Sequence, residues 1–399
     1  GDGVGDLVVG SSRFPTYGYE GTVVGYYGPF TAGIQAPTTY DDFLYGASTF
    51  AGSQTFGQQV RNLGDLDGDG DDELLAYFDV GDEWLLYEGG DSGSFSYLSG
   101  EDGYFPSCTN AARGGSFDAT AGGDWFCADE DYLSARGAVY LYSALATSSS
   151  ATITGEAINQ YAGTSLAGGG DIDGDGVDDL VVGAPYLDSA TIDIGAAYVV
   201  YGPVSGSLGL ASADLKMTGT YESDMVGNRA VLPGDSDGDG YDDLVVSAPY
   251  ASPTGYGEGT IYVVTTPGSG AIETYADGKV VGNMGMDTIG MEALDAGDFD
   301  GDGTIDVLVS SYDDNTGGAN AGAVYVAYGP ISGTVDLTTD GARWIGTNAG
   351  DYLGYAVAAV PDSDGDGKDE IAMGGMLHDY ASDATYVSNR GAVWIWLGQ

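Results

Sequence analysis

Short apolar runs alternate with acidic, glycine-rich segments along the chain. Runs such as Leu180–Pro185 and Leu244–Pro249 are too short for helices and are typical of strands buried on both faces. Each run ends in a turn, and the next strand opens on a small residue, as in Gly195–Tyr201. A glycine-containing segment precedes each acidic loop, and a further strand such as Leu215–Gly219 completes the unit. The pattern predicts an all-β chain of four-stranded antiparallel sheets.

This unit recurs with a period of about 64 residues. A lone sheet of this kind would leave an apolar face open, whereas radial stacking of sheets buries that face. The repeat therefore predicts a single seven-bladed β-propeller domain over residues 1–399, with blade 93–154 degenerate and the first and last blades incomplete. The expected blades are 1–52, 53–92, 93–154, 155–219, 220–282, 283–346 and 347–399.

The sequence leaves two ways in which the ring could be closed. By the repeat, the last blade lacks its fourth strand and the first blade lacks its innermost strand. Unpaired inner and edge strands are costly in a closed propeller. Either the sequence is a fragment of a longer chain, or another chain fills the seam.

Five acidic loops lie in register with the repeat and carry carboxylates at positions 1, 3, 5 and 9. Crowded carboxylates repel one another unless a hard divalent cation lies among them, and oxygen-only ligands favour Ca²⁺. Position 12, which holds Glu in an EF-hand, falls here in the following strand, so the acid at position 9 must close the site. The position 7 carbonyl can add a ligand. The sequence thus predicts about five calcium sites, whose expected ligands are Asp65, Asp67, Asp69, Asp71, Glu73, Asp171, Asp173, Asp175, Val177, Asp179, Asp235, Asp237, Asp239, Tyr241, Asp243, Asp298, Asp300, Asp302, Thr304, Asp306, Asp362, Asp364, Asp366, Lys368 and Glu370, with Val177, Tyr241, Thr304 and Lys368 acting through backbone carbonyls.

Two blades depart from this pattern. The first retains only Asp2 and Asp6 of a partial site, and the degenerate blade shows no metal loop. We expect no strong cation site in either blade.

The charge balance excludes several partners. Acidic residues number 61 against 10 Lys plus Arg, giving a formal net charge of −51. Nucleic acids and anionic membranes require a basic face, which this chain lacks. No apolar run reaches the length of about 18 residues needed to span a bilayer, so no direct membrane insertion is expected.

The stretch from Gly89 to Ala135 reads as a long irregular insertion. Its cysteines, Cys108 and Cys127, are compatible with one disulfide in an oxidising compartment or with two free thiols. Long loops on rigid scaffolds often carry function. A ligand loop is therefore one interpretation and simple packing of the degenerate blade is the other, for five aromatic residues: Tyr104, Phe105, Trp125, Phe126 and Tyr132.

Enzymatic chemistry has little support in this sequence. The one histidine, His378, follows the last apolar strand, and a lone loop histidine is more often solvated than catalytic. The carboxylates that could serve as acid and base are already needed for calcium. We expect a protein that is not an enzyme and uses no cofactor besides calcium.

The order Phe56-Gly57, then Asp-x-Asp-Gly-Asp-Gly-x-x-Asp, then Gly183-Ala184-Pro185 resembles the FG-GAP repeats of integrin α-subunit propellers and their bacterial or archaeal relatives. The resemblance implies seven blades, calcium loops on one face and ligand contacts on the opposite face. It favours an extracellular or cell-surface module that binds a protein or glycan and acts in adhesion. The alternatives are a surface-layer or filament subunit that self-assembles by strand donation, and a non-catalytic propeller attached to a secreted enzyme.

Overall fold

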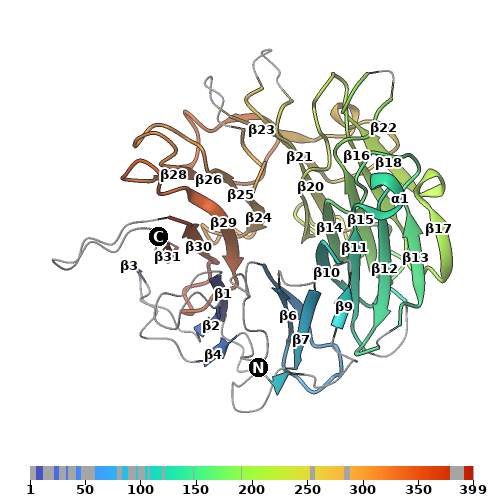
Figure 1. Ribbon diagram of the computed structural model, residues 1–399. Helices are drawn as coiled ribbons and strands as arrows, with labels where there is room; N and C mark the ends of the chain where they lie inside the picture. The colour runs from blue at the N-terminus through green and yellow to red at the C-terminus, as the bar shows by residue number, and fades with distance from the viewer. Residues whose placement is uncertain are drawn as a thin grey trace.

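The computed structural model describes residues 6–11, 22–26, 33–34, 42–45, 59–78, 83–88, 96–97, 104–106, 108–118, 122–146, 148–189, 191–251, 257–282, 288–377 and 391–398. Its regular structure is almost entirely β-strand, and the strands form separate sheets around a ring (Figure 1). We number these sheets 1 to 7 in chain order. No helix in these ranges is long and apolar enough to cross a membrane.

Sheets 1 to 3 come from the N-terminal half of the chain. Sheet 1 contains β1 (Leu7–Ser11), β2 (Thr22–Tyr26) and β4 (Asp42–Tyr45). Sheet 2 contains β5 (Val60–Gly64), β6 (Glu73–Phe78), β7 (Glu83–Glu88), β8 (Ser96–Tyr97) and β9 (Tyr104–Pro106). Sheet 3 contains β10 (Asn110–Gly115), β11 (Asp124–Asp129), β12 (Ala138–Ser143), β13 (Ala151–Thr154) and β17 (Gly206–Gly209). Because β8 and β9 both pair with β7, sheet 2 takes strands from both sides of residue 92, the expected blade limit.

Sheets 4 to 7 follow the repeat more regularly. Sheet 4 contains β14 (Ser165–Gly170), β15 (Asp179–Ala184), β16 (Ala196–Val200), β18 (Leu215–Thr218) and β22 (Gly270–Ala271). Sheet 5 contains β19 (Ala230–Gly234), β20 (Asp243–Ala248), β21 (Thr260–Val264), β23 (Gly278–Val281) and β27 (Gly333–Asp336). Sheet 6 contains β24 (Leu294–Gly297), β25 (Asp306–Ser311), β26 (Ala323–Ala327) and β28 (Ala342–Ile345). Sheet 7 contains β29 (Leu353–Val360), β30 (Glu370–Gly375), β31 (Ala392–Trp396) and β3 (Gly33–Ile34). The short helices are α1 (Tyr132–Ala135), η2 (Leu210–Ser212) and η3 (Ile272–Thr274).

In sheets 4, 5 and 6 the two middle strands form the buried centre. In sheet 4 every residue of β15 and β16 is buried, as the uninterrupted apolar runs predict. The two strands pair in antiparallel register, with Leu180 opposite Val200 and Ala184 opposite Ala196. The outer strand β18 is only partly buried. The middle strands therefore supply most of the surface that neighbouring sheets cover.

Hydrophobic clusters join each sheet to the next. Residues of sheets 3 and 4 form one cluster, and equivalent clusters join sheets 2 and 3, 4 and 5, 5 and 6, and 6 and 7. Sheet 1 contributes Val23 to a cluster with sheet 2, and Leu7 to a cluster that includes Ala372 of sheet 7. The ring is therefore closed by sheet 1, which Figure 1 shows between sheets 2 and 7.

The predicted β-propeller is confirmed, but the prediction of seven four-stranded blades is wrong. Six sheets have the four or five strands of a full blade, whereas sheet 1 has three among the described residues. The pattern Asp6-Leu7-Val8-Val9-Gly10 identifies β1 with the second strand of the other sheets. The described residues include no strand N-terminal to β1.

Connections between the third and fourth strands link sheets 4, 5, 6 and 1 to the sheet that precedes each of them in the ring. Strands β17, β22 and β27 lie in these connections and extend the preceding sheet by pairing in parallel with its fourth strand. The short strand β3 lies in the same connection of sheet 1 and pairs with β31 of sheet 7, with Gly33 opposite Ile395. The chain thus supplies from its own N-terminal part the strand that sheet 7 lacked in the sequence analysis.

A disulfide between Cys108 and Cys127 lies in the cluster between sheets 2 and 3. It joins the segment that leads into β10 to the middle of β11, with the two Cα atoms 5.4 Å apart. Both cysteines are buried, and the indole N–H of Trp84 donates to the carbonyl oxygen of Cys108. The bridge therefore ties together two neighbouring strands of the least regular blade.

Candidate metal centre

The five acidic loops connect the first and second strands of sheets 2, 4, 5, 6 and 7. They comprise residues 65–73, 171–179, 235–243, 298–306 and 362–370. Because these loops join equivalent antiparallel strands of neighbouring sheets, they all lie at one end of the ring. We call this end the acidic face.

The loop between β14 and β15 shows how the sequence folds locally. The carboxylate of Asp171 accepts N–H bonds from Gly174 (2.7 Å), Asp175 (3.1 Å) and Gly176 (2.9 Å). Gly174 and Gly176 have φ angles of 76° and 87°, which side chains disfavour, so glycine permits the tight curl. The two glycine bonds to the first carboxylate recur in the other loops, at Asp65, Asp235, Asp298 and Asp362.

The acid at position 9 is the first residue of the second strand and is completely buried in every loop. One of its carboxylate oxygens accepts the backbone N–H of position 2, as Asp179 does from Ile172 at 2.7 Å. The other oxygen differs between loops. In Asp179 and Asp306 it accepts the N–H of Gly202 or Gly329, whereas Asp243 Oδ1 and Glu370 Oε1 have no hydrogen-bond partner. A buried carboxylate oxygen without a donor fits a cation as its partner.

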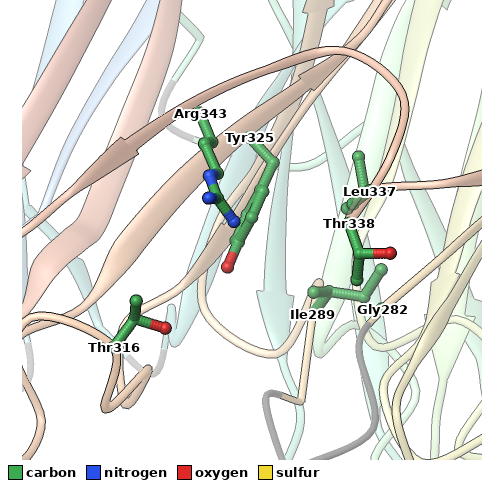
Figure 2. A pocket seen from close by; sticks show the side chains of 7 residues that line it. All are labelled: Gly282, Ile289, Thr316, Tyr325, Leu337, Thr338 and Arg343. Atoms are coloured by element: carbon green, nitrogen blue, oxygen red, sulfur yellow. The ribbon is translucent and has the colours of Figure 1, made fainter.

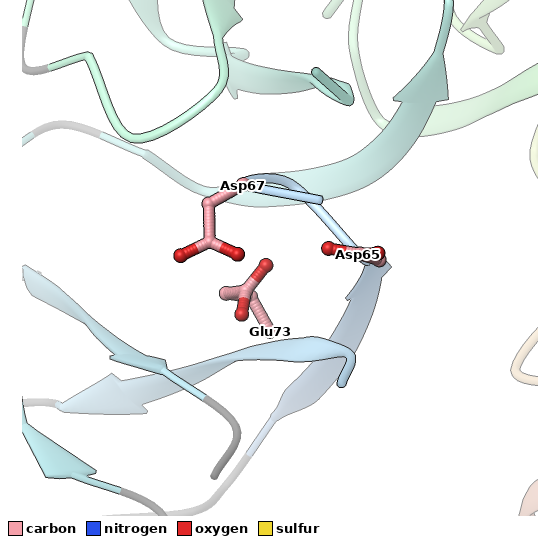
Figure 3. Close-up of side chains that lie close together, drawn as sticks. All are labelled: Asp65, Asp67 and Glu73. Atoms are coloured by element: carbon pink, nitrogen blue, oxygen red, sulfur yellow. The ribbon is translucent and has the colours of Figure 1, made fainter. Parts of the chain in front are cut away.

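Carboxylate oxygens of positions 1, 3 and 9 or 1, 3 and 5 converge in all five loops. Within each group one oxygen per residue lies within 4.8 Å of the others. Figure 3 shows the side chains of Asp65, Asp67 and Glu73 directed toward a common point. The groups are Asp65, Asp67 and Glu73; Asp171, Asp173 and Asp179; Asp235, Asp237 and Asp239; Asp298, Asp300 and Asp302; and Asp362, Asp364 and Glu370.

The other predicted ligands are not part of these groups, and the position 7 residues were predicted to act through their carbonyls. Asp69, Asp175, Asp243, Asp306 and Asp366 lie outside these three-residue groups. The residues at position 7 donate their backbone N–H to the acid at position 5, for example Val177 to Asp175 at 2.8 Å. The same bond forms at Asp71, Tyr241, Thr304 and Lys368.

Burial makes the position 9 carboxylates hard to ionise. Desolvation raises the pKa of Asp179 to about 6 and that of Asp306 to about 7, and it also raises the pKa of Asp243 and Glu370. The neighbouring carboxylates at positions 1 or 3 add to the effect. A positive charge among these oxygens would reverse it. The all-oxygen donor set and the unpartnered oxygens fit a hard divalent cation such as Ca²⁺.

Sheet 3 contains a relic of the acidic loop that the sequence analysis missed. Gly115 and Asp124 are separated by the same number of residues as Gly170 and Asp179, and Phe117 is buried as Ile172 is. Asp124 is completely buried, accepts the N–H of Asp118 at 2.7 Å and has a pKa raised to about 6 by burial. The spacing from Gly115 to Asp124 was the signal in the sequence that could have identified this loop. It was missed because the loop lacks the other aspartates of the pattern.

The predicted partial site in the first blade is only partly visible. Asp6 is described and exposed, just before β1, whereas Asp2 lies outside the described residues. His378 lies outside them as well.

The predicted ligand loop is corrected by burial. Trp125 and Phe126 are completely buried in β11, so they cannot reach a ligand. Phe126 packs edge-to-face on Phe117, with 4.9 Å between ring centroids. Tyr104 and Phe105 lie in β9, paired with β7, and Tyr132 is half-buried in α1. The described parts of this segment are mostly β-strand, and the sequence alone did not show that Trp125 and Phe126 face inward.

Phe126→Ala is expected to destabilise the fold by about 3–5 kcal/mol, because it removes a buried ring from the cluster between sheets 3 and 4. Urea unfolding measures the change. The matched control is Tyr132→Ala, whose half-buried ring should cost less than half as much. Equal losses from the two variants would contradict the packing role of Phe126.

The opposite end of the ring carries most of the exposed apolar side chains. This end, which we call the loop face, is formed by the connections from second to third strands and from each sheet to the next. Among the described residues, eight of the nine large exposed apolar side chains lie there, and only Tyr241 lies on the acidic face. The eight are Leu133, Ile158, Tyr186, Ile192, Tyr221, Tyr250, Tyr355 and Met376.

Backbone hydrogen bonds hold the connections of the loop face together. Ser223 and Met225 donate their N–H groups to the carbonyls of Ile192 and Asp193, and Tyr352 donates to Asn320 in the same way. Aromatic rings also meet there, with Tyr161 and Tyr186 centroids 5.3 Å apart and Tyr312 and Tyr355 centroids 6.2 Å apart. The loop face is therefore a connected surface rather than a set of independent loops.

A small pocket between sheets 5 and 6 is lined by Ile289, Tyr325, Arg343 and their neighbours (Figure 2). Its free space is about that of one water molecule. This pocket is too small to hold an organic substrate.

Comparison with known proteins finds a known repeat in two of these sheets. A family profile described as FG-GAP repeat matches residues 162–201 and 227–264, which include the acidic loops of sheets 4 and 5. Integrin alpha-IIb of Mus musculus is 33% identical over 189 residues, and that of Homo sapiens is 32% identical over 192 residues. Each of these two matches covers 46% of this chain and 17% of the relative. Integrin alpha-PS2 of Drosophila melanogaster is 37% identical over 118 residues, which are 28% of this chain and 8% of that protein.

The chain therefore spans less than a fifth of the length of these integrin relatives. Among solved structures, the Dos1 propeller aligns over 94% of this chain and 72% of its own length, at 11% identity and a TM-score of 0.46.

Proposed function

Because the chain is an FG-GAP repeat protein related to integrin α subunits, we propose that it is an extracellular module that binds a protein ligand through its loop face and takes part in adhesion. Calcium in the five acidic loops holds the blades together at the opposite face. The chain acts by binding and performs no catalysis.

The observation that carries the proposal is the gathering of exposed tyrosine and aliphatic side chains on one face. Tyr186, Tyr250 and Tyr355 are 39%, 42% and 40% exposed, although each belongs to a strand end or a turn of a rigid sheet. Exposed aromatic residues on a fixed scaffold are typical anchors of protein interfaces. Hydrogen bonds between the connections reduce the ordering cost of binding.

The ligand's charge follows from that of the chain. With a formal net charge of −51, the protein attracts basic surfaces and repels acidic ones. Acidic side chains lie near the exposed tyrosines. Burial is the main cause of the raised pKa of Tyr186 and Tyr355, and Asp193 and Glu130 raise that of Tyr186 further, as Glu292 does that of Tyr355. We therefore propose a ligand with a basic contact surface.

The acidic loops support the proposed calcium sites, and the disulfide supports the extracellular setting. Asp243 Oδ1 and Glu370 Oε1 favour an ion in their loops, and oxygen ligands of this kind suit Ca²⁺. The Cys108–Cys127 bridge is of a kind that persists in oxidising compartments. Assembly by strand donation has less support, because β3 of the same chain pairs with β31 at the position that a donated strand would need.

A binding screen tests the proposed ligand surface. The purified chain is tested in calcium against panels of extracellular proteins and of glycans, and then as the triple variant Tyr186→Ser, Tyr250→Ser and Tyr355→Ser. We expect binding to a protein that the triple variant weakens at least about tenfold, as loss of aromatic anchors does.

The matched control is Tyr241→Ser, because Tyr241 is 45% exposed on the acidic face. It should bind as the wild-type chain does in saturating calcium. Equal losses of affinity in the two variants would contradict the loop face as the binding surface. Binding to glycans alone would contradict the proposal that the ligand is a protein.

A further inference from the structure

The acidic loops of sheets 4 and 5 contact each other directly. Asp242, at position 8 of the second loop, accepts the backbone N–H of Asp171 at 2.8 Å, and its own N–H donates to the carbonyl of Asp171 at 2.9 Å. The ring of Tyr241 covers Gly174 of the first loop so closely that a Cβ there would lie 2.5 Å from Tyr241 Cε1. Three contacts thus join the two loops.

The loops of sheets 6 and 7 repeat this arrangement. Asp369 accepts the N–H of Asp298 at 3.0 Å and donates its own N–H to the carbonyl of Asp298 at 2.8 Å. Lys368 takes the place of Tyr241, since a Cβ on Gly301 would lie 3.1 Å from its Cγ. The same contact forms in a second pair of sheets although the side chain at position 7 differs. The aspartate at position 8 is therefore the common element of the contact.

This contact is not formed between the acidic loops of sheets 5 and 6. Position 8 of the loop 298–306 is Ile305, which has no side-chain acceptor for the N–H of Asp235. Gly238, the counterpart of Gly174, has nothing within 4 Å of the place where a Cβ would lie. In the loop 65–73, Asp72 instead accepts the side-chain amide of Asn62 from its own blade. The described loops therefore form two pairs and one single loop.

The contacts join cation-ligating positions of the two loops. Asp171 supplies the position 1 carboxylate, and Asp242 fixes the backbone of that residue on both its N–H and its carbonyl. Tyr241 and Asp242 lie between two expected ligands of their own loop, Asp239 and Asp243. An ion in the loop 235–243 would order this segment and thereby lower the ordering cost of binding in the loop 171–179.

We propose that calcium binds cooperatively within the pair 171–179 and 235–243 and within the pair 298–306 and 362–370, and independently between pairs. The inference rests on the proposed calcium binding, to which the unpartnered oxygens of Asp243 and Glu370 independently point. The carboxylates of Asp242 and Asp369 lie between the paired loops and offset the repulsion between two dications.

Calcium titration of the full chain, followed by native mass spectrometry and calorimetry, tests this pairing. The variant Asp237→Ala removes a ligand of the loop 235–243. We expect it to remove one site and to weaken a second at least fivefold, within the usual range of coupling between sites. The matched control Asp67→Ala, in the single loop 65–73, should affect one site only.

Removing the contact should uncouple the pair. In an Asp242→Ala background, Asp237→Ala should affect one site, like the control. The control variant is Asp178→Ala. Asp178 is at position 8 of the loop 171–179 and accepts the N–H of Ser116 in sheet 3, so its loss should leave the pairing with the loop 235–243 intact. Loss of a single site in Asp237→Ala, or coupling that survives Asp242→Ala, would overturn the proposal. A wild-type chain that binds no calcium would instead refute the proposed calcium sites themselves.

Discussion

Removing divalent cations is expected to lower the melting temperature by about 10 °C or more. At a hundredfold excess over the dissociation constant, each ion contributes about 2.7 kcal/mol, so five sites contribute on the order of 13 kcal/mol. Without ions, the carboxylates that converge in each loop also repel one another across distances below 4.8 Å. Calorimetry of metal-free and calcium-saturated protein measures the difference.

Ionic strength must be separated from ion binding in this experiment. A chain of net charge −51 is stabilised by any salt, because screening weakens its self-repulsion. The control is therefore NaCl at matched ionic strength, which should recover only a minor part of the stability. Equal recovery with NaCl and with calcium would contradict specific sites.

The metal-free chain is expected to become more stable when the pH falls from 8 to 5. Burial raises the pKa of Asp124 and Asp179 to about 6 and that of Asp306 to about 7, above the value near 3.8 in the unfolded chain. The folded state therefore binds more protons than the unfolded state in this range. The resulting stability is complete below pH about 4 and is lost as the pH rises through 6 to 7. At about 1.36 kcal/mol per pKa unit, these three carboxyls change the free energy of unfolding by several kcal/mol.

Calcium should reverse this dependence, because protons compete with the ion for the same carboxylates. Urea unfolding at pH 5 and pH 8, with and without calcium, measures both slopes. High NaCl in all samples suppresses the general repulsion between surface charges and leaves the buried groups. A metal-free chain whose stability rises steadily from pH 5 to pH 8 would contradict the raised pKa values.

The regular part of the fold could be predicted from sequence because its signals are local. Apolar runs such as Leu180–Ala184 are buried on both faces, and nothing but stacking between sheets can cover them. The acidic loops have fixed spacing, which correctly predicts that the carboxylates at positions 1 and 3 lie close together. Both features depend on residues close to one another in the chain.

The features that sequence reasoning missed depend on contacts between distant residues. The pairing of β3 with β31 joins residues at opposite ends of the chain, and neither strand carries a sign of its partner. Trp125 and Phe126 looked like loop residues because sheet 3 has lost most of its repeat signature, yet both are buried. The gathering of tyrosines on the loop face follows from the closed ring, which brings together connections that lie far apart in sequence.

A crystal structure of the chain grown in calcium tests the central claim most directly. The account predicts an ion in each of the five acidic loops, held by the carboxylates that converge there, such as Asp171, Asp173 and Asp179. Five loops that hold no ion at millimolar calcium, with their buried carboxyl groups protonated, would contradict it.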